Sequence, residues 1–441
     1  MLDRTDWLKD GTLGEWWTPE APNAKRVGVL RRVADVWRLD LYGVLGCYQY
    51  SQQDRRYEAI YGWIPSVGFI GLQECTAFKT VCFGPSQYES ELEHIQFSRL
   101  LRKSIGDNAF PQLYTSVEVK APELFYWCGS NGLRTLRPER SDEGKAPIYT
   151  YQYSEPHRIK LLWGDWKLLF WMQAGSFPFP VGRSLEISQD QAISLEFVNG
   201  LDLLTFEMKT RSLSALLSLL AGSNIDLQMF SVTPKRESLE ADKAYPMDFL
   251  KNGEAIQMSK QAADGSADHY FKFGSVERNF ETLLLGWDAS VDRYGYRVID
   301  YFAKLPNNDG IRRFMDAANL VHAIVEVDAR ILMKKQKIKV PFREAILQAS
   351  RPFSRLDPAA LESLADAIEA TRHSLAHPQS NLKSKAANGL QLAHAEAFLD
   401  SVLRCLIWTG IGLSNAEIRT RCSTHQELND KLSMNFWRAI E

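Results

Sequence analysis

The hydrophobic pattern of this chain changes its period once, and this change constrains the fold more than any other feature. After residue 310, apolar residues recur every three or four positions, as on the buried face of a helix. Before residue 306, short runs rich in Val, Ile and aromatic residues alternate with polar residues, as in half-buried β-strands. These runs lie at 27–30, 37–42, 69–72, 159–162 and 185–187. The sequence therefore predicts an α+β protein, with a β-rich N-terminal part followed by an all-α helical bundle.

The turn-forming cluster at 306–310 separates the two patterns and predicts a domain boundary. A chain of 441 residues is too long for one small core, so more than one domain is expected. We expect a β-rich domain over 1–305 and a helical domain over 306–441. Helices are predicted at 213–220, 311–337, 341–350, 358–377 and 383–409, a strand at 225–230, and an irregular loop or insertion at 231–268.

The helix predicted at 358–377 carries a charge on its apolar stripe. On a helical wheel, Arg372 lies in the middle of the arc formed by Leu364, Ala365, Ile368 and Leu375. Burying an unpaired guanidinium is costly. Arg372 is therefore expected to have a partner carboxylate, a subunit interface or an anionic ligand such as phosphate.

His377 follows on the same segment, directly before Pro378, so the helix should stop or bend there. A histidine can take the proton from a ribose 2′-hydroxyl, and an arginine can stabilise the charge on the attacked phosphate. Arg372 and His377 therefore predict RNA cleavage without a metal or cofactor. Residues five apart project about 140° from each other on an unbroken helix. The two could share one substrate only through the helix break or across a dimer interface.

Simpler explanations of these residues stay open. A two-residue pattern is common by chance, and Arg419 with His425 gives a second match, which ranks lower because it falls in a polar tail after residue 412. His377 could simply complement the helix dipole. His373 and His377 are spaced for metal ligation, but no acidic or cysteine ligand accompanies them, so no metal site is predicted.

Composition and charge exclude several classes of protein. The net charge of the chain is −2. From residue 306 onward there are 18 Lys/Arg and 15 Asp/Glu, whereas the preceding part has 34 Lys/Arg and 39 Asp/Glu. This nearly neutral balance rules out a wholly basic nucleic-acid coat. The basic run at 334–339 could contact phosphate or simply be a solvated helix end. The sequence shows neither a signal peptide nor a membrane span, and the six cysteines lack metal-binding spacing. A cytoplasmic protein with reduced thiols is expected.

Motifs in both parts of the chain resemble known families. The stretch Arg372-His373-Ser374-Leu375-Ala376-His377 is similar to the signature of the HEPN superfamily, an Arg followed by a polar residue and a His a few positions later. In the N-terminal part, four stretches resemble the N-terminal domain of ApeA-type anti-phage proteins. They are Gly14-Glu15-Trp16-Trp17-Thr18-Pro19, Gly28-Val29-Leu30, Leu39-Asp40-Leu41-Tyr42-Gly43 and the apolar run at 213–220.

The resemblance implies an endoribonuclease of the abortive-infection type, with an N-terminal domain that senses an unknown phage-derived trigger and a HEPN domain that cleaves RNA, tRNA being one candidate. Arg372 and His377 would be catalytic. His373 would fill the supporting polar position, which is often Asn or Asp in the family, and Glu326 loosely matches an acidic position on the first helix of the bundle. A homodimer or higher oligomer through the HEPN domain is implied. The alternative function is a non-catalytic HEPN module for dimerisation or nucleotide binding.

Overall fold

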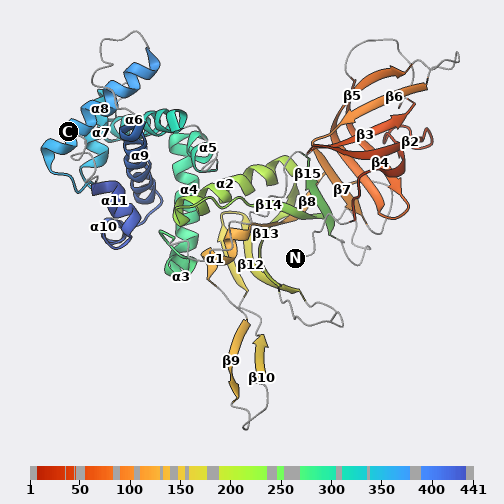
Figure 1. Cartoon of the computed structure of the whole chain (residues 1–441), viewed down its shortest axis with the longest axis horizontal. Coiled ribbons are helices and arrows are strands. Elements are labelled where there is room, and N and C mark those ends of the chain that lie inside the picture. Colours follow the sequence, from red (N-terminus) through yellow and green to blue (C-terminus); the bar gives the residue numbers. More distant parts are fainter. Residues whose placement is uncertain are drawn as a thin grey trace.

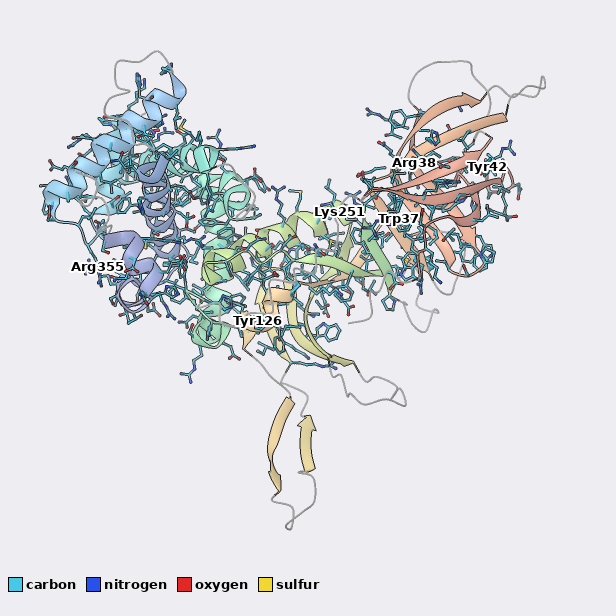
Figure 2. The ribbon with its side chains drawn as sticks, in the orientation of Figure 1. Trp37, Arg38, Tyr42, Tyr126, Lys251 and Arg355 are labelled. Carbon is cyan, nitrogen blue, oxygen red and sulfur yellow. The ribbon has the colours of Figure 1, made fainter. Side chains whose placement is uncertain are left out.

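The molecule is elongated, with a β-barrel at one end, a helical bundle at the other, and a sheet with helix α2 between them (Figure 1). In Figure 2, Trp37, Arg38 and Tyr42 mark the barrel and Arg355 marks the bundle at the far end. The β-rich part precedes the helical part, so the predicted α+β class is confirmed. The computed structural model describes residues 7–34, 36–43, 45, 55–82, 90–103, 110–129, 133–139, 148–153, 158–175, 188–235, 246–252, 269–303, 310–334, 338–377 and 389–433.

All the strand pairings of the described residues are antiparallel. The strands are β1 (Thr12–Trp17), β2 (Arg26–Val33), β3 (Val36–Tyr42), β4 (Arg55–Ile64), β5 (Gly68–Cys82), β6 (Ser90–Gln96), β7 (Arg99–Lys103), β8 (Tyr114–Lys120), β9 (Leu133–Glu139), β10 (Ile148–Tyr153), β11 (Ile159–Trp163), β12 (Trp166–Gly175), β13 (Ser188–Leu201), β14 (Gln228–Pro234) and β15 (Met247–Lys251). Strands β9 and β10 form a separate hairpin-like pair that projects from the middle of the molecule (Figure 1).

Helices occur mainly in the second half of the chain. They are α1 (Pro122–Cys128), α2 (Leu203–Ala221), α3 (Phe273–Val276), α4 (Phe280–Tyr294), α5 (Arg297–Ala303), α6 (Gly310–Met333), α7 (Phe342–Ser350), α8 (Pro358–Ala376), α9 (Gly389–Gly410), α10 (Asn415–Thr424) and α11 (Gln426–Ser433), with a 3₁₀ turn η2 (Glu277–Asn279). The helices predicted at 213–220, 311–337, 341–350, 358–377 and 383–409 correspond to α2, α6, α7, α8 and α9.

The barrel closes because β5 pairs with both β4 and β6, in the order β5-β4-β1-β2-β3-β6-β5. Trp16 fills its interior without any exposed surface, and its Nε1 donates to the Gly28 carbonyl at 3.2 Å. A Cβ at Gly62 would lie 2.3 Å from the Trp16 ring, so only glycine fits there. The barrel core therefore depends on small residues facing one large ring.

A bend in β5 connects the barrel to the central sheet. Gln73 pairs with Arg99 of β7, but Thr76 pairs with Gln96 of β6, and Glu74 between them has a φ of 54°. This left-handed backbone lets one strand belong to both structures. The sheet then runs in the order β7-β15-β14-β8-β13-β12-β11.

Helix α2 lies along the central sheet. It begins where the Asp202 side chain accepts from the Thr205 N–H at 2.8 Å, and it ends at Gly222, whose φ is 82°. From position 212 to its end, every residue of α2 is buried, because the sheet covers one side and other helices cover the rest. The continuous apolar run at 213–220 therefore reflects a helix segment that is buried on all sides.

Two buried arginines hold α2 to the ends of the molecule. Arg99 of β7 donates to Glu207 of α2 at 2.5 Å and to Glu74 of β5 at 2.6 Å. Arg404 of α9 donates from Nη1 to the carbonyls of Ser218 and Leu219, each at 3.1 Å. These carbonyls belong to the last turn of α2, and that of Ser218 also accepts from the Gly222 N–H at 3.0 Å. Arg99 therefore joins α2 to the barrel, and Arg404 joins it to the bundle.

The positive charge of Arg404 is compensated by the carboxylate of Asp400, which lies one turn earlier on α9. Arg404 Nε donates to Asp400 Oδ2 at 2.8 Å, and the Tyr301 hydroxyl donates to Asp400 Oδ1 at 2.9 Å. Burial alone would raise the pKa of Asp400, but the charges of Arg404 and Arg313 outweigh burial and lower this pKa to about 2. Asp400 is therefore ionised wherever the protein is folded near neutral pH.

Several sequence-based expectations need correction or fall outside the described residues. The region 231–268 contains the end of β14 and all of β15, so the expected loop includes a strand that connects the sheet to β7. The expected polar tail forms α10 and α11, which bury Ile418, Cys422, Leu428 and Leu432. The strand at 185–187 and the turn at 306–309 lie outside the described residues. The domain division at 305/306 stays a prediction; helices α3, α4 and α5 precede it.

Replacing Arg404 with Met should lower the free energy of unfolding by about 3–5 kcal/mol, because the buried Asp400 and the Ser218 and Leu219 carbonyls each lose a hydrogen bond from the guanidinium. Arg211 provides a matched control, since it joins α2 to α5 through a solvent-exposed ion pair with Asp300 at 2.7 Å. Arg211→Met should cost about 1 kcal/mol or less. Urea unfolding measures both changes, and similar losses in the two variants would contradict the central role of Arg404.

Candidate active site

Helix α8 positions Arg372 and His377 at its C-terminal end. The helix starts as the sequence predicts: the Asp357 side chain accepts from the Ala360 N–H at 2.8 Å, and Pro358 occupies the first turn. The buried residues Leu361, Leu364, Ala365 and Ile368 hold this helix on the bundle. The last turn extends past this anchored face.

The guanidinium of Arg372 lies between a ring and an amide. Its Nε donates to Asn319 Oδ1 of α6 at 2.9 Å, and its central carbon lies 4.5 Å from the centroid of the Phe342 ring at the start of α7. The amide fixes the rotation of the guanidinium and the ring supports its flat face. Three helices therefore orient one cationic group.

The expectation for Arg372 needs a correction. We expected a buried guanidinium with a partner carboxylate, an interface or an anion, but the side chain is only partly buried, because Ala376 and His377 beyond it are exposed. Among the described residues, no carboxylate lies within ion-pair distance of Arg372. The amide and the ring orient the guanidinium but neutralise none of its charge. This charge is therefore available to an anionic ligand or a second chain.

Glu326 is linked to the Phe342 ring through His322 and not through Arg372. The His322 ring packs edge-on against Phe342, with centroids 5.4 Å apart, and Glu326 Oε1 lies 3.7 Å from His322 Nε2. Glu326 also accepts from the Val340 N–H at 3.4 Å, just before α7. Glu326 thus holds the start of α7, which carries the ring beneath Arg372, and makes no described contact with Arg372 itself.

His377 ends α8, as Pro378 predicts, and Pro378 itself lies outside the described residues. The His377 backbone has a φ of −133° and its N–H donates to the His373 carbonyl at 2.8 Å. The two imidazole rings are exposed, with centroids 5.0 Å apart. No described contact joins either ring to Arg372. One chain therefore brings the two histidines together but does not bring Arg372 to His377.

The two residues of the second Arg/His match, Arg419 and His425, differ in burial. Arg419 is exposed on α10, whereas His425 is buried and packs edge-on against Tyr270, with centroids 4.7 Å apart. His425 belongs to the core between α10 and α11. The buried His425 ring and the exposed Arg419 side chain therefore form no common surface site in this fold.

Sequence reasoning missed Asn319, His322 and Phe342. Asn319 and His322 are three residues apart and Glu326 follows four residues later, so their common face on α6 could be recognised from spacing. Nothing in the sequence shows that this face meets Arg372, because that contact depends on how α6, α7 and α8 pack. Phe342 would be taken for an ordinary core residue.

The described residues hold neither a metal cluster nor a membrane-spanning helix. No three His, Cys, Asp or Glu side chains among them gather closely enough to bind an ion. No helix in the described ranges has the length and apolar character needed to cross a bilayer.

The family match covers the barrel, the central sheet and the start of the helices. The family described as ApeA N-terminal domain 1 matches residues 12–287, more than half of the chain. The chain therefore belongs to this family, whose ApeA-type members are anti-phage defence proteins, and the resemblance seen in the N-terminal motifs is confirmed. The match ends before α5, so it does not include Arg372 or His377. No curated protein and no solved structure matches the chain.

Replacing Arg372 or His377 with Ala should change the free energy of unfolding by about 1 kcal/mol or less, because neither side chain is buried or ion-paired with a described residue. A buried residue of the same helix gives the contrast: Leu364→Ala should cost roughly 2–5 kcal/mol. Urea unfolding compares the three variants. A large loss in Arg372→Ala would show that this arginine is structural.

Proposed function

We propose that this protein is a metal-independent endoribonuclease of the abortive-infection type, and that its helical bundle cleaves RNA through Arg372 and His377. The observation that carries the proposal is the guanidinium of Arg372, which is oriented by Asn319 and Phe342 while its charge stays unneutralised. An oriented, uncompensated guanidinium suits a phosphate. The defence role follows from the ApeA-type family.

In the proposed mechanism, His377 takes the proton from a ribose 2′-hydroxyl, and the resulting oxygen attacks the adjacent phosphorus. The bond to the 5′-oxygen breaks and leaves a 2′,3′-cyclic phosphate and a free 5′-hydroxyl. Arg372 stabilises the negative charge that develops on the phosphate. His373, whose ring lies 5.0 Å from that of His377, suits the protonation of the leaving oxygen.

Glu326 has a positioning role in this proposal rather than a catalytic one. It holds the backbone at Val340 and faces His322, and these contacts support the Phe342 ring. A carboxylate beside the phosphate would repel it, so the separation of Glu326 from Arg372 is consistent with RNA binding.

A homodimer, or a higher oligomer of dimers, would complete the site. Within one chain no described contact joins Arg372 to His377, so a two-fold axis through the bundle could place each beside the other chain's partner residue. The end of α6 offers a surface for this purpose: Ile331, Leu332 and Met333 are 53%, 81% and 61% exposed. Consecutive exposed apolar side chains favour a protein contact.

We assign recognition of a phage-derived trigger to residues 1–305 and chemistry to 306–441. The family match covers the barrel and the central sheet, which supports a shared recognition role for that part. Arg99 and Arg404 give a physical connection between the two parts through α2.

The second candidate function is a non-catalytic module that dimerises or binds a nucleotide through the same bundle. The absence of a described contact between His377 and Arg372 favours this second function, since binding of a nucleotide phosphate needs only the arginine. RNA cleavage distinguishes the two functions.

The purified protein should cleave RNA in the presence of EDTA, and Arg372→Ala and His377→Ala should each lower the rate by at least about a hundredfold, the usual contribution of one acid-base or charge-stabilising group. Arg419→Ala is the matched control and should retain the activity. Gel analysis of labelled RNA gives the rates. Loss of cleavage with chelator, full activity in His377→Ala, or cleavage of an all-deoxy strand would contradict the mechanism.

The protein should be at least dimeric at micromolar concentration, because no described contact joins Arg372 to His377 within one chain. Leu332→Asp should weaken the dimer and the RNase rate together, since it puts a charge on the proposed contact. Val198 of β13 is 70% exposed but lies on the central sheet, so Val198→Asp should change neither. Light scattering measures the mass, and a monomeric wild-type protein with full activity would overturn the composite site.

A further inference from the structure

Helices α9 and α10 bring two cysteine thiols into contact. Cys405 Sγ and Cys422 Sγ lie 3.6 Å apart, although the residues are 17 positions apart in the chain. Both residues are buried, with 0% and 3% of their surfaces exposed. Cys75 and Cys128 are free thiols with no described thiol neighbour. The contact between Cys405 and Cys422 is therefore a feature of how α10 packs on α9.

The surroundings make the two thiols chemically different. The hydrogen bond from Cys405 lowers the pKa of the Cys422 thiol, and the positive charge of Arg355 adds to this effect although burial opposes it. Burial raises the pKa of Cys405 well above its usual value and raises that of Cys75 to about 12. Cys422 is therefore the better nucleophile of the pair, and Cys405 is placed to follow it.

Arg355 is fixed at the edge of the bundle (Figure 2), where its Nη1 donates to Asn429 Oδ1 of α11 at 2.6 Å. Its backbone N–H donates to the Leu432 carbonyl at 3.3 Å. The charge that favours the Cys422 thiolate thus comes from a residue held by the neighbouring helix, and does not depend on a mobile side chain.

Access to the buried pair depends on the attachment of α10. Of the ten residues of α10, only Ile418 and Cys422 are buried. A short helix held by two buried side chains detaches at a lower free energy than the core of the bundle. A small oxidant can therefore reach the thiols without global unfolding.

We propose that Cys405 and Cys422 form a site of reversible oxidation, at which hydrogen peroxide converts the two thiols into a disulfide that fastens α10 to α9. The Cys422 thiolate attacks peroxide: an S–O bond forms, the O–O bond breaks, and the departing hydroxide takes up the proton that the Cys422 thiol lost on ionisation and becomes water. The Cys405 sulfur then attacks the Cys422 sulfur; the S–S bond forms, the S–O bond breaks, and a second water leaves with the Cys405 proton. Each peroxide is reduced by two electrons, which the two thiols supply.

The disulfide would link α9 and α10 covalently, next to the contact between the helical bundle and the central sheet. The sulfurs must approach from 3.6 Å to about 2.05 Å, which requires only a small shift of α10. Cys405 directly follows Arg404, the residue that binds the last turn of α2. The disulfide constrains the part of α9 that binds α2, and this effect does not depend on whether the bundle cleaves RNA.

Peptide mapping of the full-length protein tests the proposal. The protein is treated with hydrogen peroxide, its remaining thiols are alkylated, and it is digested with trypsin without reduction. Trypsin cuts after Arg404, Arg419, Arg421 and Lys431, so the disulfide should join peptide 405–419 to peptide 422–431. Dithiothreitol should separate the two peptides.

Variants and unfolding give independent readouts. Cys422→Ser and Cys405→Ser should lose the joined peptides, whereas Cys75→Ser should keep them. The unfolding temperature of the wild-type protein should rise on oxidation and fall again with dithiothreitol, because the cross-link restricts the unfolded chain. The peptide mapping uses the wild-type protein, so its result remains valid even where a serine variant folds poorly.

Three outcomes would overturn the site: thiols at 405 and 422 that stay unmodified under oxidation, a Cys422 sulfinic acid without joined peptides, or joined peptides that pair other cysteines.

Discussion

The buried guanidinium of Arg404 is the interaction on which the arrangement of this protein depends. It provides hydrogen bonds to the Ser218 and Leu219 carbonyls in the last turn of α2 and to Asp400, and it packs against the rings of Tyr270 and Phe302. A buried charge that loses a partner is costly, so only a narrow range of orientations between α2 and α9 satisfies it. Apolar packing alone would tolerate more sliding. The same argument applies to Arg99 at the barrel end of α2.

These ionic contacts continue toward the candidate site. Asp400 also accepts from Arg313 of α6 at 3.3 Å, and Arg313 pairs with Glu396 at 2.9 Å. Two turns further along α6, Asn319 binds Arg372. The contacts therefore form a continuous series from α2 through α9 and α6 to the helix face that orients Arg372. Under the proposed function this series offers a route from the N-terminal part to the candidate site, and double-mutant cycles measure its coupling.

Much of the fold could be predicted, and the failures have physical reasons. Strand and helix segments such as 37–42 and 213–220 were recognised because their apolar spacing reflects burial directly. Strand β15 was missed because five residues between polar segments carry little periodicity, and its place is set by pairing with β14 and β7. Helices α10 and α11 were missed because few of their residues are buried. Trp163 packs inside the central sheet: it is fully buried, with the Lys209 ammonium 3.4 Å from its ring centroid.

The sequence by itself determined the α+β class, the family of the N-terminal part, the start and end of α8, and the placement of Arg372 on its apolar side. These properties are encoded in local spacing, in capping residues and in the position of Pro378, all of which act over a few residues. The tertiary structure alone decided that Arg372 contacts Phe342 and Asn319, that Glu326 supports α7, and that Arg404 binds the last turn of α2. Each of these contacts joins residues far apart in the chain, and its geometry follows from the packing of whole helices, which local sequence patterns do not specify.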